Sequence, residues 1–514
     1  MIVKTFGSCT YGIHAITITV EVSVEIGVNF YLVGLPDSAV KESQQRIASA
    51  LGYYGYRIPG KRIIINMAPA DIRKEGSAYD LTIAIGILAA SGKVKADALG
   101  RFVIMGELSL DGKLKPVRGV LPITLEAKKQ GFEGVLLPQS NASEAAVVDG
   151  IAVYGAQTIK EVVDFLNGTP MQPVRVDTQR LFTQAAYAGE LDFSDVRGQE
   201  NAKRALEIAA AGGHNVIMIG SPGSGKTMLA KRMPSILPPM TLEEALETTK
   251  IHSVSGKLPH DVPLMTSRPF RAPHHTISDV ALVGGGSHPM PGEISLAHHG
   301  VLFLDELPEF KRSVLEVLRQ PLEDRCVTVS RSKMSVEYPA SFMFIAAMNP
   351  CPCGYYGHPD KKCACQPQRI QQYMHKISGP LLDRIDMHIF PYSIRQEELL
   401  GRKKGESSLQ IRERVVKARK IQEARFKGIP GVYCNAQMGE RLFRQYCDLD
   451  ASGRQLLKHA MEKLGFSARA YNRILKVART IADLDGQERI LPQHLSEAVG
   501  YRNLDRENWG KEKP

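Results

Sequence analysis

The chain has 514 residues, of which 43% are apolar and 23% charged, values typical of a soluble globular protein of about three domains. Its 45 glycines and 30 prolines are too few for a low-complexity or fibrous chain. The longest apolar run, residues 81–90, falls far short of the ~20 residues that span a bilayer, and the first residues lack the pattern of a signal peptide. We therefore expect a cytoplasmic protein without a membrane partner, whose thiols stay reduced.

The positive charge is concentrated near the C-terminal end. The formal net charge is +11, and residues 401–514 carry 24 Lys and Arg against 14 Asp and Glu, so nearly the whole excess lies there. A localised basic excess is typical of a nucleic-acid-binding surface, and it is equally typical of a solvated helical face. Charge alone leaves both interpretations open.

The first 170 residues predict a mixed α/β domain. Residues 16–26 alternate strictly between apolar and polar side chains, which indicates a half-buried strand. Further strands are expected at 62–66 and 102–108, and helices at 38–51, 79–90 and 123–130. A polar stretch with Gly and Pro follows at 171–190 and indicates a linker.

The middle of the chain predicts a parallel α/β sheet. Short, entirely apolar strands are expected because strands of such sheets are buried on both faces. The predicted strands are 215–219, 301–304 and 342–347, and the predicted helices are 201–211 and 226–233. After residue 393 the pattern becomes helical, with apolar residues at the 3.6 period over 474–484.

The sharpest motif lies between the predicted strand 215–219 and the helix 226–233. It fits G-x-x-x-x-G-K-[ST] and consists of Gly220, Ser221, Pro222, Gly223, Ser224, Gly225, Lys226 and Thr227. Backbone N–H groups of such a loop surround phosphate oxygens, and the helix N-terminus favours their negative charge. We expect Lys226 to contact the β- and γ-phosphates of ATP and Thr227 to hold Mg²⁺. The alternative is an ordinary Gly-rich turn.

Polar residues follow the next two predicted strands. Asp305 and Glu306 come directly after the strand 301–304, and we expect Asp305 to bind Mg²⁺ and Glu306 to act as the general base. Asn349 follows the strand 342–347 and would position the attacking water. Taken alone, Asn349 is better explained as the start of a turn before Pro350.

The order of these elements resembles that of an AAA+ ATPase, and finer stretches resemble the YifB/ComM family of magnesium-chelatase-like ATPases over essentially the whole chain. The stretches that carry the resemblance are 271–278, 291–300, 301–310, 347–354 and 378–386. The resemblance implies that Asn349 is the sensor-1 residue, that Arg384 is an arginine finger and that Arg469 is the sensor-2 residue on a helical lid. Arg319 is a further candidate for a contact in trans. Without the family, each arginine would be assigned to a surface ion pair.

An arginine finger that reaches the neighbouring subunit's γ-phosphate implies a homo-oligomer, for which the family implies a hexameric ring. Residues 252–300 resemble an insertion of the helix-2 type. Residues 327–330 and 334–338 predict a hairpin whose tip carries Arg331 and Lys333. The family places loops of the ring interior in this region, and two cations at a hairpin tip suit a phosphate backbone. The alternative is a solvated turn.

Four of the eight cysteines lie within fifteen residues, as Cys351, Cys353, Cys363 and Cys365 in the pattern C-x-C-x₉-C-x-C. Four thiolates can close a tetrahedral Zn²⁺ site, and we expect zinc here. The C-x-C spacing is tighter than the usual C-x₂-C, and His358 is a rival ligand. Unligated thiols are the alternative.

The N-terminal segment resembles the Lon protease domain at residues 106–112 and 116–119, and residues 73–78 resemble its nucleophile loop. Ala78 stands where that family has serine, and residues 120–124 lack the expected lysine. A Ser–Lys dyad needs both groups, so we expect no proteolysis and interpret Ser77 as a turn residue.

The predicted architecture is an N-terminal Lon-protease-like (ribosomal S5 domain 2-like) α/β domain over 1–170, a linker over 171–190, an AAA+ P-loop α/β core over 191–392 and a basic helical lid over 393–514. The expected function is an ATP-driven ring motor that acts on single-stranded or branched DNA, and the family implies branch migration in recombination during natural transformation. An alternative is a chelatase-like ATPase that remodels a protein partner. A nucleotide-dependent scaffold that does not hydrolyse ATP is disfavoured, because every residue expected for hydrolysis is present: Lys226, Asp305, Glu306, Asn349 and Arg384. The expected cofactors are ATP, Mg²⁺ and Zn²⁺.

Overall fold

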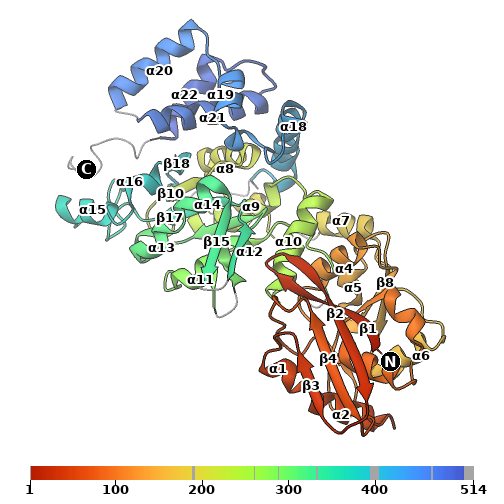
Figure 1. Cartoon of the computed structure of the whole chain (residues 1–514). Coiled ribbons are helices and arrows are strands. Elements are labelled where there is room, and N and C mark those ends of the chain that lie inside the picture. The colour runs from red at the N-terminus through yellow and green to blue at the C-terminus, as the bar shows by residue number, and fades with distance from the viewer. Residues whose placement is uncertain are drawn as a thin grey trace. The chain divides into compact units, whose positions relative to one another are not determined.

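The computed structural model describes residues 2–187, 191–259, 261–286, 289–331, 334–393, 405–464 and 467–502. The chain divides into two compact units, Met1–Gln184 with Leu242–Thr266, and Ala185–Thr241 with Ser267–Pro514 (Figure 1). The predicted fold class, an α/β chain with a parallel sheet and a helical C-terminal region, is confirmed. Among the described residues, no helix combines the length and the apolar character needed to cross a membrane.

The first unit is built on a seven-stranded sheet of order β3-β4-β2-β1-β5-β8-β9. Strands β1, β2 and β4 are antiparallel neighbours, whereas β3 is parallel to β4, and β5, β8 and β9 are parallel to one another. Their bounds are β1 Ile2–Tyr11, β2 His14–Glu25, β3 Phe30–Val33, β4 Arg62–Ala68, β5 Phe102–Ile104, β8 Gly134–Pro138 and β9 Ala152–Ala156. The predicted strand at 102–108 is two strands, β5 and the short β6 (Glu107–Leu108), which pairs with β7 (Leu114–Lys115).

Helix α3 (Asp80–Ala90) is the central helix of this unit. Ten of its residues are buried, and it packs on β1 and β2, which explains why its sequence is apolar on every side. The other helices are α1 Ser38–Lys41, α2 Ser43–Tyr53, η1 Ala96–Arg101, α4 Val120–Lys129, α5 Gln139–Ala145, α6 Ile159–Leu166 and α7 Thr178–Tyr187.

Helix α10 (Leu242–Val254) follows the P-loop helix in the chain, yet it belongs to this first unit and packs on α4. The Gly119 N–H donates to the carbonyl of the buried Ser253 at 3.3 Å, and the Ser253 hydroxyl donates to the half-buried carboxylate of Glu144. These polar contacts thus hold this segment of the chain in place.

The second unit contains a five-stranded parallel sheet of order β11-β14-β17-β10-β18. Every residue of the last four strands is buried, which accounts for their entirely apolar sequences. The bounds are β11 Phe270–Arg271, β14 Val301–Leu304, β17 Met343–Met348, β10 Val216–Ile219 and β18 Met387–Ile389. Because β17 lies between β14 and β10, the carboxyl ends of three neighbouring strands meet at one edge.

Short elements surround this sheet. The predicted hairpin is confirmed as β15 (Cys326–Arg331) paired with β16 (Met334–Pro339), with Arg331 opposite Met334. The remaining elements are η2 Phe193–Asp195, α8 Glu200–Gly212, α9 Lys226–Ile236, α11 Asp279–Val283, β12 Gly284–Gly285, β13 Met290–Pro291, α12 Glu293–Leu296, η3 Leu307–Glu309, α13 Arg312–Glu316, α14 Arg319–Asp324, α15 Pro367–Met374 and α16 Gly379–Leu382.

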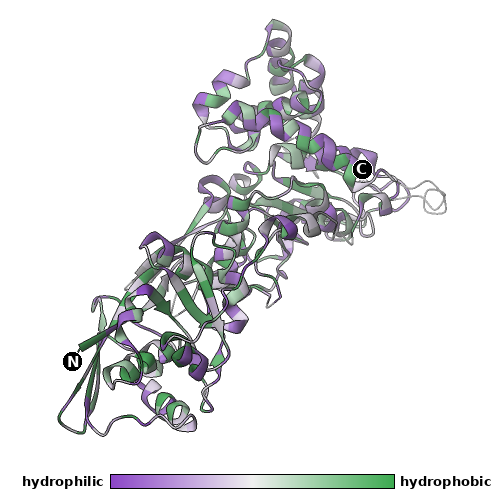
Figure 2. Cartoon of the chain, turned by 90° about the vertical axis from the view of Figure 1, so that its right-hand side faces the viewer, coloured by the Kyte–Doolittle hydropathy of each residue, from purple (hydrophilic) through white to green (hydrophobic). Residues whose placement is uncertain are grey.

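The segment predicted as a helical lid consists of helices, which are named the lid helices here. They are α18 Ser408–Phe426, η4 Asn435–Gln437, α19 Glu440–Tyr446, α20 Ala451–Leu464, α21 Ala468–Leu484 and α22 Pro492–Gly500. Figure 2 shows hydrophilic and hydrophobic residues alternating along these helices, as expected for amphipathic helices. Helices α18 and α21 both pack against the Ala-rich α8 of the sheet domain.

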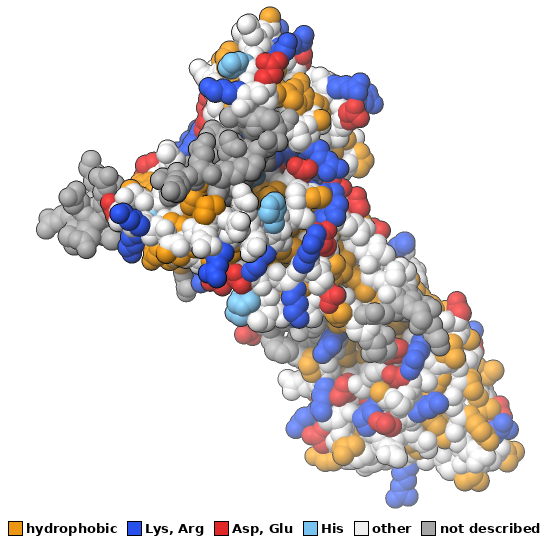
Figure 3. Space-filling view, turned by 90° about the vertical axis from the view of Figure 1, so that its left-hand side faces the viewer, with side chains coloured by type: hydrophobic (Ala, Val, Ile, Leu, Met, Phe, Trp, Pro, Cys, Tyr) orange, Lys and Arg blue, Asp and Glu red, His pale blue; other side chains and the backbone are white. Residues whose placement is uncertain are grey.

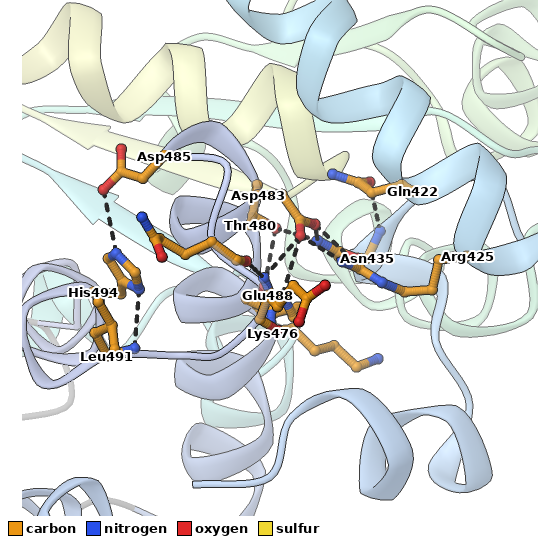
Figure 4. A network of polar contacts seen from close by, with 12 residues as sticks. Gln422, Arg425, Asn435, Lys476, Thr480, Asp483, Asp485, Glu488, Leu491 and His494 are labelled. Atoms are coloured by element: carbon orange, nitrogen blue, oxygen red, sulfur yellow. Dashed lines mark hydrogen bonds and ion pairs between the residues drawn. The ribbon is translucent and has the colours of Figure 1, made fainter. Parts of the chain in front are cut away.

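A buried polar network joins the lid helices (Figure 4). Asp483 of α21 accepts hydrogen bonds from Arg425 of α18 at 2.8 Å and from the Asn435 amide at 2.7 Å. Arg479, one turn earlier in α21, donates to the same carboxylate at 3.1 Å. A buried charge that is paired in this way fixes the relative positions of the helices that contribute to it.

Candidate nucleotide site

The loop between β10 and α9 requires its three glycines. Gly223 and Gly225 both have φ of +81°, in the left-handed region that glycine adopts without strain. A Cβ on Gly220 would lie 2.5 Å from the Ser224 hydroxyl oxygen. Helix α9 begins directly after the loop at Lys226, so the backbone has the form of a phosphate-binding loop.

Lys226 lies across this loop. Its ammonium donates to the carbonyls of Gly220 at 2.7 Å and Ser221 at 3.0 Å, and to the amide oxygen of Asn349 at 3.2 Å. Burial lowers the pKa of Lys226, although the Asp305 and Glu306 carboxylates oppose this effect. The cation therefore joins the P-loop to the end of β17, where phosphate oxygens would compete with these acceptors.

The acidic pair lies at the end of the adjoining strand β14. The Thr227 hydroxyl donates to Asp305 at 2.6 Å, and the Glu306 N–H donates to the other oxygen of Asp305 at 3.0 Å. Glu306 has φ of +53°, a conformation that costs energy for a residue with a side chain. Its own carboxylate is 60% exposed and is available to solvent. Thr227 and Asp305 thus present two oxygens side by side, a donor set that suits Mg²⁺.

Two residues at this site have no role in the sequence-based prediction. The His275 Nδ1 lies 3.7 Å from a carboxylate oxygen of Glu306, since β11 and β14 are parallel neighbours whose following loops meet. Gln199, which is 1% exposed, donates from its amide to the carbonyl of Ser224 at 3.1 Å and from its N–H to the Tyr392 hydroxyl at 3.0 Å. Neither contact has a sequence signal, because each depends on the packing of distant segments.

The two predicted arginines lie together elsewhere. Arg384 and Arg469 line one pocket of about 270 Å³, whose described lining includes no residue of the P-loop, the acidic pair or Asn349. Arg384 is buried and pairs with Glu323 at 2.6 Å, whereas Arg469 is 60% exposed and lies 3.6 Å from Asp383. Arg319 pairs with Glu316 at 2.7 Å and lines an adjacent groove that Arg384 also borders.

Asp386 connects the Arg384 segment to the lid and to the P-loop strand. Its carboxylate accepts from Arg473 of α21 at 2.7 Å and from the Asn215 N–H, just before β10, at 2.8 Å. Although burial opposes ionisation, Arg473, His214 and the Asn215 N–H together hold the pKa of Asp386 well below its ordinary value. The Asn215 amide donates to the carbonyl of Arg384 at 3.2 Å, which completes the connection.

The four predicted cysteines form a compact cluster. The sulfur of Cys351 lies 3.3 Å from that of Cys353 and 3.7 Å from that of Cys363, and all four sulfurs lie within 4.8 Å of one another. Four sulfurs at about 2.3 Å from a tetrahedral Zn²⁺ would be separated by about 3.8 Å, whereas a disulfide requires about 2.05 Å. The cluster therefore fits a metal ion.

His358 has a different role from the one considered in the sequence. Its Nδ1 accepts the N–H groups of Asp360 and Lys361, both at 3.1 Å, and its ring is not part of the sulfur cluster. Backbone N–H groups of Tyr355 and Ala364 also bond to Cys353 and, against the effect of burial, lower the pKa of that thiol, whereas burial raises the pKa values of Cys363 and Cys365. Such N–H bonds stabilise the thiolate form that binds metals.

Other predicted residues are placed as follows. The backbone of Arg331 ends β15, while its side chain and the whole of Lys333 lie outside the described residues. In the Lon-like region, the Ser77 hydroxyl donates to the Glu107 carboxylate, and Thr124 is a buried helical residue bonded to the carbonyl of Val120.

A P-loop follows the interior parallel strand β10, and an asparagine and an acidic pair follow the next two strands, β17 and β14, which is the arrangement of a P-loop ATPase. Family models match residues 192–399 ("Magnesium chelatase, subunit ChlI"), 20–141 ("Subunit ChlI of Mg-chelatase") and 405–502 ("Magnesium chelatase, subunit ChlI C-terminal"). The chain belongs to the YifB/ComM family of magnesium-chelatase-like AAA+ ATPases.

Similarity to individual relatives extends over the whole chain. Competence protein ComM from Haemophilus influenzae is 46% identical over 506 residues, which cover 98% of this chain and 97% of the relative. The uncharacterized protein YifB from Escherichia coli is 42% identical over 501 residues, 96% of each chain. Lon protease 2 from Bacillus subtilis is 31% identical over 128 residues, 25% of this chain and 23% of that protease.

Proposed function

We propose that this protein is an ATP-hydrolysing ring motor that acts on DNA, as a branch-migration helicase in recombination and natural transformation. The observation that carries the proposal is its similarity, over nearly the full length, to a competence protein. The arrangement of the nucleotide site supports the ATPase part of this proposal independently.

Each residue of the site has a distinct role in ATP hydrolysis. The N–H groups of the loop 220–227 bind the phosphates, and Lys226 exchanges its carbonyl partners for phosphate oxygens. Thr227 and Asp305 hold Mg²⁺, which would supply positive charge to those oxygens. Glu306, exposed at the end of β14, accepts the proton of the attacking water, and Asn349 orients that water.

The arginine pocket supports an assembly of several copies. Arg384 and Arg469 line one pocket whose described lining contains none of the nucleotide-site residues. An exposed cation apart from its own P-loop, such as Arg469, is suited to the γ-phosphate of ATP held by an adjacent subunit, and the buried Arg384 would exchange Glu323 for that phosphate. We therefore propose a homo-oligomeric ring, with a hexamer as the expected number.

We propose that the β15–β16 hairpin, with Arg331 and Lys333, contacts DNA. Three arginines of the C-terminal segment already have partners in the lid or in α8, which weakens the competing interpretation at those positions. Arg414 pairs with Glu406 at 2.8 Å, Arg419 donates to the carbonyl of Ala211 at 2.6 Å, and Arg425 pairs with Asp483. On the face drawn in Figure 3, basic and acidic side chains are intermixed rather than separated.

We also propose Zn²⁺ as the metal of the cysteine cluster. Four thiolates in tetrahedral spacing select zinc over Mg²⁺ or Ca²⁺, which prefer oxygen ligands. Elemental analysis of protein purified without chelator or metal-affinity resin should find about one zinc per chain. A value near zero in folded protein would refute this assignment.

The second candidate function is a chelatase-like ATPase that remodels a protein partner, because all three matching family models describe a magnesium chelatase subunit. ATPase rates measured with single-stranded, double-stranded and four-way-junction DNA discriminate between the two candidates. Stimulation by DNA, weakening steeply with salt, is expected. If no DNA form binds or stimulates hydrolysis at low salt, the protein-remodelling function takes its place.

Two matched variants locate the DNA contact. Arg331→Ala with Lys333→Ala and Lys417→Ala with Lys420→Ala each remove two positive charges, the first pair from the hairpin and the second from an exposed position on α18. The hairpin pair should reduce both DNA binding and DNA-stimulated hydrolysis, whereas the α18 pair should retain the maximal rate at saturating DNA. The reverse result would assign the contact to α18.

A further inference from the structure

The cysteine loop, residues 351–365, touches the P-loop directly. The backbone of Gly354 lies so close to Pro222 that a Cβ built on it would be 2.5 Å from the Pro222 Cδ and 2.8 Å from its Cγ. The same Cβ would be 3.9 Å from the amide carbon of Asn349. Gly354 therefore packs against the two elements that Lys226 joins, the P-loop and the end of β17.

The cysteine loop is also continuous with Asn349 in sequence. Cys351, which is 0% exposed, follows Asn349 by two residues, and its carbonyl accepts the Gly354 N–H at 3.0 Å in a tight turn. Gly354 has φ of +84°, which favours glycine at this position. A metal ion that fixes the sulfurs of Cys351 and Cys353 therefore also fixes the direction of the backbone after Asn349. It likewise fixes the contact between Gly354 and Pro222.

The far end of the loop returns to the same place. Helix α15 begins two residues after Cys365, and its Tyr373 forms a hydrogen bond with the Asn349 backbone. Burial, with the nearby Glu309 carboxylate, raises the pKa of the Tyr373 hydroxyl, so this group stays a neutral donor and acceptor. Asn349 is thus held from both ends of the cysteine loop.

The sulfur cluster joins the two ends of this loop, whose middle is largely open to solvent. Residues 355–366 are all exposed or half-buried, so they bury too little apolar surface to offset the entropy of ordering a long loop. Metal binding to a site of this kind supplies the free energy that orders the chain around it.

We propose that the four thiolates, closed on Zn²⁺, are a positioning device for the nucleotide site: they hold Gly354 against Pro222 and Asn349 against Lys226. This role rests on the zinc assignment made above. Without the metal, the loop opens while the buried sheet and the lid stay folded. The P-loop and Asn349 then lose their common support, so ATP binds more weakly and hydrolysis slows.

The first test removes the metal ligands at the far end of the loop. Cys363→Ser with Cys365→Ser should lose zinc, bind a fluorescent ATP analogue about tenfold or more weakly and show a lower kcat. Cys326→Ser, a half-buried thiol of β15 outside the cluster, is the control and should match wild type. Circular dichroism and the thermal midpoint report whether the variant is folded.

A second pair of variants keeps all four cysteines. Gly354→Ala introduces a Cβ into Pro222, whereas Gly357→Ala introduces one at φ of +73° in open space in the same loop. Both variants carry similar backbone strain, so they differ in the contact with the P-loop. Gly354→Ala should retain zinc but raise KM for ATP by about tenfold or more and lower kcat, and Gly357→Ala should keep wild-type values.

The outcomes separate this role from the zinc assignment. Folded, active wild-type protein without zinc would refute both. If the wild type contains zinc and the cysteine variants lose it but bind and hydrolyse ATP normally, the site is zinc-bound and the positioning role is wrong. Equal effects of Gly354→Ala and Gly357→Ala would also refute the contact as the route of action.

Discussion

The ammonium of Lys226 lies 3.2 Å from the amide oxygen of Asn349, a hydrogen bond between residues 123 positions apart in the chain. It forms because β10 and β17 are parallel neighbours whose carboxyl ends lie side by side. The residue that would bind phosphate and the residue that would orient water are therefore linked directly before any nucleotide arrives. Loss of either side chain should affect the other.

Lys226→Ala should weaken ATP binding by at least about ten- to hundredfold, because a hydrogen bond to a charged group contributes about 1.5–3 kcal/mol. Fluorescent-nucleotide titration measures this change. The control is Lys231→Ala, an exposed lysine of the same helix α9 that should bind ATP as the wild type does. Equal affinity for ATP in the two variants would show that Lys226 does not contribute to ATP binding.

Glu306→Gln should keep ATP bound and lower the hydrolysis rate by about 10²–10⁴-fold, since an amide cannot accept the proton of the attacking water. Glu462→Gln is the control, because Glu462 lies at an exposed position of α20, in the lid. Single-turnover hydrolysis of radiolabelled ATP measures both. Wild-type turnover in Glu306→Gln would assign the base elsewhere.

The nucleotide loop could be predicted from sequence because its signals are local. A buried strand, three glycines in fixed positions and a helix that starts at Lys226 are consecutive, and so are β14 and the acidic pair. Strand β1 was not predicted, because Thr5 occupies a buried position in the alternation and satisfies its hydroxyl by donating to the carbonyl of Thr82 at 3.1 Å. A buried polar residue of this kind hides the period-two pattern.

Contacts that depend on which strands are neighbours in the sheet could not be predicted from sequence. His275 lies beside Glu306 only because β11 pairs with β14, and no spacing in the sequence reveals that pairing. Helix α10 was also missed, since Thr248, Thr249 and His252 are buried in it and disturb the apolar period of a helix. In both cases the sequence does not reveal which distant segments pack together.

Arg469→Ala should leave ATP binding intact and lower the ATPase rate, since Arg469 is exposed in a pocket apart from its own P-loop. Mixing it with Lys226→Ala protein should restore part of the activity, because one type of interface then joins an intact P-loop to an intact arginine. The control is Arg454→Ala, an equally exposed arginine paired with Asp448. No recovery in assemblies shown to contain both variants would argue against action in trans.

The lowered pKa of the buried Lys476 predicts that the stability of the protein depends on pH. Its ammonium donates to the carbonyls of Ala436 at 3.1 Å and Met438 at 2.6 Å, while burial and the nearby Arg473 lower its pKa to about 8, against partial compensation by Asp386. The other groups that face it are Cys447 and Arg325. The folded lysine therefore releases its proton more readily than the unfolded one, whose pKa is 10.5.

Between pH 8 and 10.5 the unfolded chain binds more protons at Lys476 than the folded chain does, so this residue makes stability rise with pH across that window. Below pH 8 both states are protonated and the unfavourable contribution is constant. Lys476→Met removes this titration, so the variant's denaturation midpoint, measured relative to wild type, should fall as pH rises from 8 to 10. Lys458→Met, at an exposed position of α20, should show a constant difference. Urea midpoints at three pH values measure both variants, and a constant difference for Lys476→Met would contradict the lowered pKa.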